Sequence, residues 1–161
     1  MPIPIPSTPY SLLETLIGLE ERPGPKDNHP LVQWGLELCG LGRNQPDEIA
    51  WCSAILQPIM HLLKLPRSKS AAARSWLKVG LEITIPEAKR GFDVVILKRG
   101  PEPQPGPEVT SGAPGHVGLF SGMEYGGATA TRVRVLAGNQ SDSINVQAFP
   151  LSQVLGVRRI G

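Results

Sequence analysis

The feature that most constrains the fold of this chain is a change in hydrophobic periodicity near Pro86. Before Pro86, apolar residues recur at the three- and four-residue spacing of amphipathic helices. After it, short runs with the composition of β-strands follow one another, separated by turn residues. Helices first and strands second is the order of an α+β domain, so we expect helices packed on one face of an antiparallel sheet.

Four helices are predicted before the change, over residues 10–21, 28–40, 47–65 and 70–80. In the second, Asn28 is the expected N-cap and Pro30 lies just inside the helix. The third opens with two acidic residues, Asp47 and Glu48, which suit the positive end of a helix dipole. It carries Cys52 in its first turn or two, and Pro58 is expected to kink it.

Five strands are predicted after the change, over residues 92–97, 116–120, 131–137, 143–148 and 154–160. Between the first two lies PEPQPGPEVTSGAPG, which is too rich in Pro and Gly for regular structure and leads directly to His116. Residues 1–9 alternate Pro with small apolar residues and are expected to form an extended lead-in. The 161 residues suit one domain, so residues 10–161 are predicted to be a single domain.

Composition narrows the classes of function. Hydrophobic residues make up 40% and charged residues 19% of the chain, which is typical of a globular protein rather than a disordered or membrane-embedded one. The net charge of +2 comes from dispersed basic residues and gives no reason to expect nucleic acid as a partner. The N-terminus lacks the basic and apolar regions of a secretory signal, and no apolar run suits a membrane span. We therefore expect synthesis in a cytoplasm without a signal peptide, and no membrane insertion.

The two cysteines have different expected environments. Cys52 lies near a helix N-terminus, where oriented N–H groups and the dipole favour a thiolate nucleophile, although a buried apolar role is common for a free cysteine. Cys39 lies near the C-terminal end of the second predicted helix, where the dipole opposes a thiolate, and is interpreted as a core residue.

Three histidines are candidates for a general base. His61 follows Cys52 by nine residues, which is about half a turn off the same helix face, so it points away. His29 lies at the start of the second helix, where a capping or solvated side chain is expected. His116 begins a strand after a glycine-containing loop and can project into a cleft, so it is the preferred candidate.

A third residue is needed to orient the imidazole. Asn139 follows the predicted strand 131–137 and would serve if this strand lies near His116, although Gly138-Asn139 is also a common turn sequence. No CxxC, HxxxH or HExxH spacing is present, so no metal or other cofactor is expected. A G-x-S-x-G elbow is also missing, so serine hydrolysis has no local support. Trp51 is a candidate substrate-stacking residue or a core residue, whereas Trp34 and Trp76 are interpreted as core.

Taken in order, the segments DEIAWCSAIL, SAAARSWLKVG, GHVGLF, RVLAGNQSDSINV and VLGVRR resemble the small NlpC/P60- and CHAP-like cysteine peptidoglycan hydrolases of phages and prophages. The resemblance covers nearly the whole chain after the lead-in, and WCSA and GHVG are its most specific parts. It implies a papain-like fold with Cys52 as nucleophile, His116 as base and Asn139 as the third residue. Gln140 is the alternative third residue and a possible substrate contact. Pro58 and the long proline-rich loop depart from the family pattern.

Three hypotheses follow. The first is an enzyme that hydrolyses an amide bond in bacterial peptidoglycan at the cell wall, either a phage endolysin released through a holin or a secreted antibacterial effector. The second is a wall-binding or virion structural protein that keeps the fold without turnover. The third is a thiol enzyme with a protein or small-molecule amide substrate, since the catalytic residues do not encode the substrate.

Overall fold

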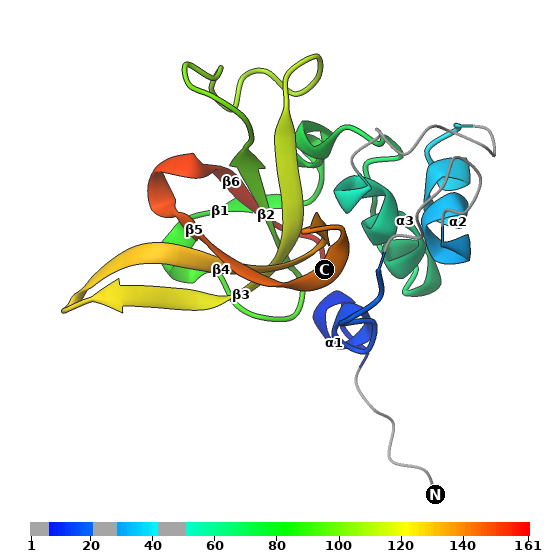
Figure 1. The fold of residues 1–161 in the computed structure, drawn as a ribbon, viewed down its shortest axis with the longest axis horizontal. Helices are drawn as coiled ribbons and strands as arrows, with labels where there is room; N and C mark the ends of the chain where they lie inside the picture. Colours follow the sequence, from blue (N-terminus) through cyan, green and yellow to red (C-terminus); the bar gives the residue numbers. More distant parts are fainter. Residues whose placement is uncertain (1–6, 21–28, 42–50) are drawn as a thin grey trace, which may run out of the picture.

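The computed structural model describes residues 7–20, 29–41 and 51–161. Its α-helices are α1 (Pro9–Glu14), α2 (Pro30–Leu38) and α3 (Cys52–Leu62). Three short 3₁₀ helices follow: η1 (Ala73–Lys78), η2 (Ile85–Glu87) and η3 (Leu151–Gln153). The structure is thus α+β, with helices before strands, as predicted (Figure 1).

Helix α1 is shorter than the predicted helix 10–21. It begins with a capping box between Thr8 and Ser11 and ends at Glu14. The chain then turns, and Gly18, with a φ of 90°, donates its N–H to the carbonyl of Ile144 at 3.0 Å. Leu19 accepts a hydrogen bond from Ile144 in return at 2.9 Å. The prediction was wrong beyond Glu14 because pairing with the sheet replaces the last helical turns.

The next helices also differ in detail from prediction. Helix α2 is capped by His29, whose ring accepts from Leu31 N–H at 3.2 Å, and the predicted cap Asn28 lies outside the described residues. Helix α3 starts at Cys52 and contains Pro58; residues 47–50 of the predicted helix also lie outside the described part. The segment 70–80 forms only the 3₁₀ helix η1.

A six-stranded antiparallel sheet follows, in the order β1-β6-β2-β3-β4-β5. The strands are β1 (Leu81–Ile83), β2 (Asp93–Lys98), β3 (Gly115–Gly126), β4 (Thr129–Gln140), β5 (Ser143–Pro150) and β6 (Val154–Arg159). All five predicted strands are present, and no strand or helix interrupts the long loop between β2 and β3. The sixth strand, β1, was not predicted because three largely exposed residues carry no hydrophobic pattern.

The core has two parts, one on each face of the sheet. On one face the α-helices pack against inward-facing strand residues such as Ile96, Val117 and Leu136. On the other face, strand residues including Val95, Leu97 and Val135 pack among themselves. Figure 1 shows the helices gathered on one side of the curved sheet, with the β3–β4 hairpin extending away from them. This arrangement brings the N-terminus of α3 against β3.

Helices α2 and α3 approach each other closely at Gly35. A Cβ atom at this position would lie 2.0 Å from the carbonyl oxygen of Ala54 in α3. Only glycine, which has no Cβ atom, avoids this clash. None of the helices in the described part of the chain is long and apolar enough to cross a membrane.

Candidate active site around Cys52 and His116

Cys52 is the first residue of α3, and its side chain is fully buried between the helices and the sheet. Burial raises the pKa of the Cys52 thiol, whereas a backbone hydrogen bond from Val117, the positive charge of Arg99 and the backbone of Ser53 and Cys52 act to lower it. Val117 directly follows His116 on β3, so the sulfur lies against the strand that carries the histidine, while the His116 side chain projects from the opposite face of that strand toward Phe149. The predicted position of Cys52 at the start of its helix is confirmed.

Buried polar side chains fix the start of α3. The Ser53 hydroxyl donates to the Ser70 carbonyl at 2.6 Å and accepts from the indole N–H of Trp76 at 2.8 Å. One turn later, the Gln57 amide donates to the same Ser70 carbonyl at 3.1 Å. Ser53, Gln57 and Trp76 are each 0% exposed. These bonds anchor the first turns of α3 to the segment before η1 and so hold the cysteine in place.

His116 lies near the beginning of β3, opposite Leu97 of β2 in the ladder, and is 5% exposed. Its Nε2 lies 3.0 Å from Oε1 of Gln140, and its ring centroid lies 5.6 Å from that of Phe149. Burial lowers the pKa of His116, the Gln140 hydrogen bond raises it and the charge of Arg99 lowers it further. The imidazole is therefore favoured in its neutral form, as a general base requires.

Gln140 sets the tautomer of this imidazole. Its amide nitrogen donates to the backbone carbonyl of Asn145 at 2.7 Å and to the side-chain oxygen of the same residue at 3.0 Å. The amide oxygen therefore faces His116 and accepts the Nε2 proton, which leaves the lone pair on Nδ1. Gln140 thus holds the position of the orienting residue.

A β-bulge explains why Gln140, and not Asn139, meets the histidine. Ala137 pairs with Asn145, but the next pair is Gln140 with Ser143, so β4 holds one residue more than β5 in this interval. Asn139 adopts a φ of 57° within the bulge. Because side chains alternate along a strand, the extra residue moves Gln140 to the face of Ala137, which is also the face of His116. Asn139 lines the nearby pocket without a hydrogen bond to the ring.

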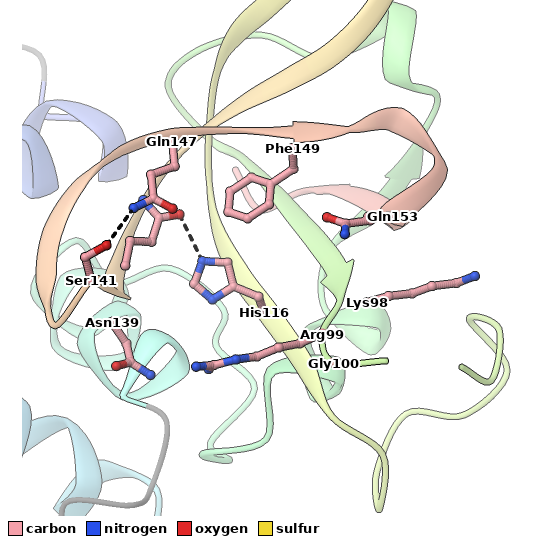
Figure 2. A pocket seen from close by; sticks show the side chains of 10 residues that line it. Lys98, Arg99, Gly100, His116, Asn139, Ser141, Gln147, Phe149 and Gln153 are labelled. Carbon is pink, nitrogen blue, oxygen red and sulfur yellow. Dashed lines mark hydrogen bonds between the residues drawn. The ribbon is translucent and has the colours of Figure 1, made fainter. Parts of the chain in front are cut away.

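A pocket of about 240 Å³ opens beside His116, and we call it the Arg99 pocket. Its described lining comes from the end of β2 and the chain that follows, from β3, from the end of β4 and the β4–β5 turn, from β5 and from η3. Figure 2 shows these residues. The ten lining residues are Lys98, Arg99, Gly100, His116, Asn139, Gln140, Ser141, Gln147, Phe149 and Gln153. Cys52 is not among them, and the described contacts include no direct hydrogen bond between its sulfur and the His116 ring.

Arg74 holds the long loop that precedes His116. This arginine of η1 is 0% exposed, and its guanidinium donates to backbone carbonyls of the loop. The acceptors are Pro105, Gly106, Val109 and Pro114, at 2.8–3.2 Å. The loop is thus ordered around one buried cation, although its Pro and Gly content predicts no regular structure. Neither Arg74 nor Arg99 was singled out from sequence, because a basic residue outside a known motif resembles any surface charge.

Trp51 is a core residue, and its candidate role in substrate stacking does not fit the structure. Its side chain is 3% exposed, and the ring lies over the backbone of Gly138, where an added Cβ would come within 2.5 Å of it. The tryptophan instead supports the strand just before the bulge. Trp76 is fully buried, as predicted, whereas Trp34 is half-buried and contacts His61 edge-on, with ring centroids 5.8 Å apart.

The remaining candidates lie apart from this site. His61 is exposed near the end of α3, and His29 caps α2. Cys39 is the half-buried C-cap residue of α2, and burial raises its pKa to about 11. Within residues 7–20, 29–41 and 51–161, no group of three or more His, Cys, Asp or Glu side chains is placed to hold a metal ion. Comparisons with protein-family models, with curated proteins and with solved structures gave no match to this chain.

Proposed function

We propose that this protein is a cysteine hydrolase that cleaves an amide bond in bacterial peptidoglycan. The observation that carries the proposal is the His116–Gln140 pair, which lies beside the strand residue whose backbone contacts Cys52. A helix-borne cysteine packed on an antiparallel sheet, with a histidine and an amide on the sheet, is the arrangement expected of a papain-like fold. The order of helices and strands supports the same assignment.

In the proposed reaction, Nδ1 of His116 accepts the proton of the Cys52 thiol while the sulfur attacks the amide carbonyl carbon. Since burial raises the thiol pKa and lowers that of His116, we expect proton transfer to accompany attack rather than to precede it as a stable ion pair. The backbone N–H of Cys52, at the helix N-terminus, helps to hold the oxyanion. His116 then protonates the leaving amine, and water, deprotonated by His116, releases the acyl group from sulfur.

The proposed substrate rests on the resemblance of WCSA and GHVG to cell-wall hydrolases, not on the geometry alone. The proposed activity is that of an amidase or a peptide endopeptidase. The proposed role is that of a phage endolysin, which reaches the wall after release through a holin. A secreted antibacterial effector with the same chemistry is the alternative setting. Cys52 is fully buried in the core on the helix face, whereas the His116 ring packs on Phe149 of the other face. The proposal therefore also requires that substrate binding exposes the sulfur and brings it within reach of Nδ1.

The test is digestion of purified peptidoglycan by the wild-type protein and by Cys52→Ala, with Cys39→Ala as the matched control. Soluble products are identified by mass spectrometry. We expect wild type and Cys39→Ala to release fragments with new amino termini or freed glycan chains, and Cys52→Ala to release none. Release by Cys52→Ala at the wild-type rate would refute a cysteine mechanism, and no release by any protein would refute the cell-wall substrate.

One observation favours a second candidate, a wall-binding or virion structural protein of the same fold. Cys52 is completely buried and does not line the Arg99 pocket, as would suit a cysteine without a chemical role. This candidate predicts that wild type and Cys52→Ala sediment equally with insoluble peptidoglycan and that neither solubilises it.

A further inference from the structure

The Arg99 pocket combines positive charge with the absence of any acidic side chain among its ten described lining residues. Two consecutive cations, Lys98 and Arg99, contribute to it. Lys98 forms an ion pair with Glu102 at 3.3 Å, which offsets its charge. Among the described residues, no carboxylate pairs with Arg99. Arg99 is therefore the one guanidinium of this pocket, and no carboxylate in the described part of the chain offsets its charge.

The direction of the Arg99 side chain places this charge beside the proposed reaction centre. Figure 2 shows Arg99 extending across the pocket beneath the His116 ring toward Asn139, whereas Lys98 points the other way. Arg99 and His116 line the same pocket, and the charge of Arg99 acts to lower the pKa of both His116 and Cys52. A ligand group bound to this guanidinium would therefore lie beside His116, the proposed base.

The rest of the lining suits a peptide. Gln147 and Gln153 offer amide donors and acceptors for a peptide backbone, and Phe149 provides an apolar surface against His116. A guanidinium presents a planar pair of N–H donors that matches the two oxygens of a carboxylate. The amides of Gln147 and Gln153, together with the guanidinium of Arg99, therefore match an acidic peptide better than a neutral sugar.

We propose that the Arg99 pocket binds a carboxylate that the peptide substrate carries near the scissile amide. This inference rests on the proposed function and adds to it that the enzyme selects acidic over amidated stem peptides. In this proposal Arg99 is a binding residue. Its electrostatic effect on the Cys52 thiol is a separate property, and the test excludes this effect because Cys52 is replaced by alanine.

The test measures binding in a Cys52→Ala background, in which no thiol can be affected and no turnover occurs. The probes are the tripeptide L-Ala-γ-D-Glu-L-Lys and the same peptide with its D-Glu α-carboxylate amidated, titrated by calorimetry. We expect the free acid to bind roughly tenfold more tightly or better, as a charge-assisted hydrogen bond contributes. Adding Arg99→Gln should remove this difference, and adding Arg134→Gln, the loss of an exposed arginine outside the pocket, should keep it.

Equal affinity for the two peptides, or no binding of either, would overturn the inference. So would a preference for the free acid that survives Arg99→Gln. These results are independent of the digestion experiment: a wild-type protein that digests peptidoglycan but shows no acid preference disproves the carboxylate site alone. A protein with the acid preference but no digestion disproves the hydrolase and keeps the site.

Discussion

The two cysteines lie at opposite kinds of helix end, and burial raises the pKa of both. Cys39 caps the C-terminus of α2, where its surroundings are carbonyl groups, and only the charge of Arg67 favours its thiolate. Cys52 begins α3, where backbone groups of three residues and the charge of Arg99 all favour its thiolate. Burial acts in the same direction on both pKa values, so the factors that favour a thiolate at Cys52 are the polarity of its helix end and the neighbouring strand.

This comparison shows what a helix terminus contributes to chemistry. A fully buried thiol is normally inert, yet Cys52 has hydrogen-bond donors directed at its sulfur and a neutral imidazole on the adjacent strand. Cys39 has neither. The following predictions test this difference, from the largest expected effect to the smallest.

Replacing each cysteine by serine should produce the largest difference in hydrolysis rate between the two positions. Cys52→Ser is expected to lower the rate of peptidoglycan hydrolysis by about 10³–10⁴-fold or more, since the nucleophile acts together with its base. Cys39→Ser should stay within about twofold of wild type, as expected of a site away from the chemistry. Initial rates at equal folded concentration provide the measurement. A large loss in both variants would contradict the separation.

The His116 imidazole is hydrogen-bonded to Gln140, and comparing Gln140 with Asn139 gives a second contrast within one bulge. Gln140→Ala should lower kcat about 10- to 100-fold, because a lost hydrogen bond of about 1–3 kcal/mol frees the ring orientation. Asn139→Gly is the control, since glycine keeps the positive φ at that position. We expect it to lower kcat by less than about threefold. A greater loss in Asn139→Gly than in Gln140→Ala would assign the orienting role to Asn139 instead.

Thiol labelling sharpens the comparison without any substrate. With its pKa near 11, Cys39 should react with iodoacetamide roughly tenfold more slowly than a free thiol, because a smaller thiolate fraction outweighs the higher nucleophilicity of that thiolate. Cys52, at 0% exposure, should be slower still in the folded protein. Peptide mapping by mass spectrometry gives both rates, and labelling in denaturant should make them equal. Faster labelling of Cys52 than of Cys39 would show that its sulfur is accessible in the free protein.

The pH profile is expected to show the smallest effect. Because burial lowers the pKa of His116, the imidazole stays neutral below pH 6.5, and kcat/KM should begin to fall only beneath that value. The Gln140 hydrogen bond raises this pKa, so in Gln140→Ala the acid limb should move to still lower pH. Rates measured from pH 4.5 to 8 in one buffer series would check both statements. An acid limb above pH 6.5 would disagree with a buried histidine base.

Hydrophobic periodicity was enough to predict much of the fold. The five predicted strands appear because each has enough alternating or continuous apolar residues to mark a buried strand. Strand β1 has only three residues and no buried face, so it leaves no pattern to read. Helix α1 was predicted too long because its apolar spacing continues past Glu14, whereas hydrogen bonds with Ile144 turn the chain toward β5. The local hydrophobic pattern indicates which residues are buried, but it does not indicate which segment the backbone forms hydrogen bonds with.

The amino-acid sequence by itself predicted the α+β order and the position of Cys52 at a helix start, and it made His116 the preferred candidate among the histidines. Only the tertiary structure decided the rest of the site. One extra residue in β4 reverses the alternation of side chains, and this exchanges Asn139 for Gln140 at the imidazole. The burial of Trp51 and the placement of Arg99 in one pocket with His116 depend equally on contacts between segments far apart in the chain. Such contacts have no local signature, because periodicity describes one segment and a site is made from several.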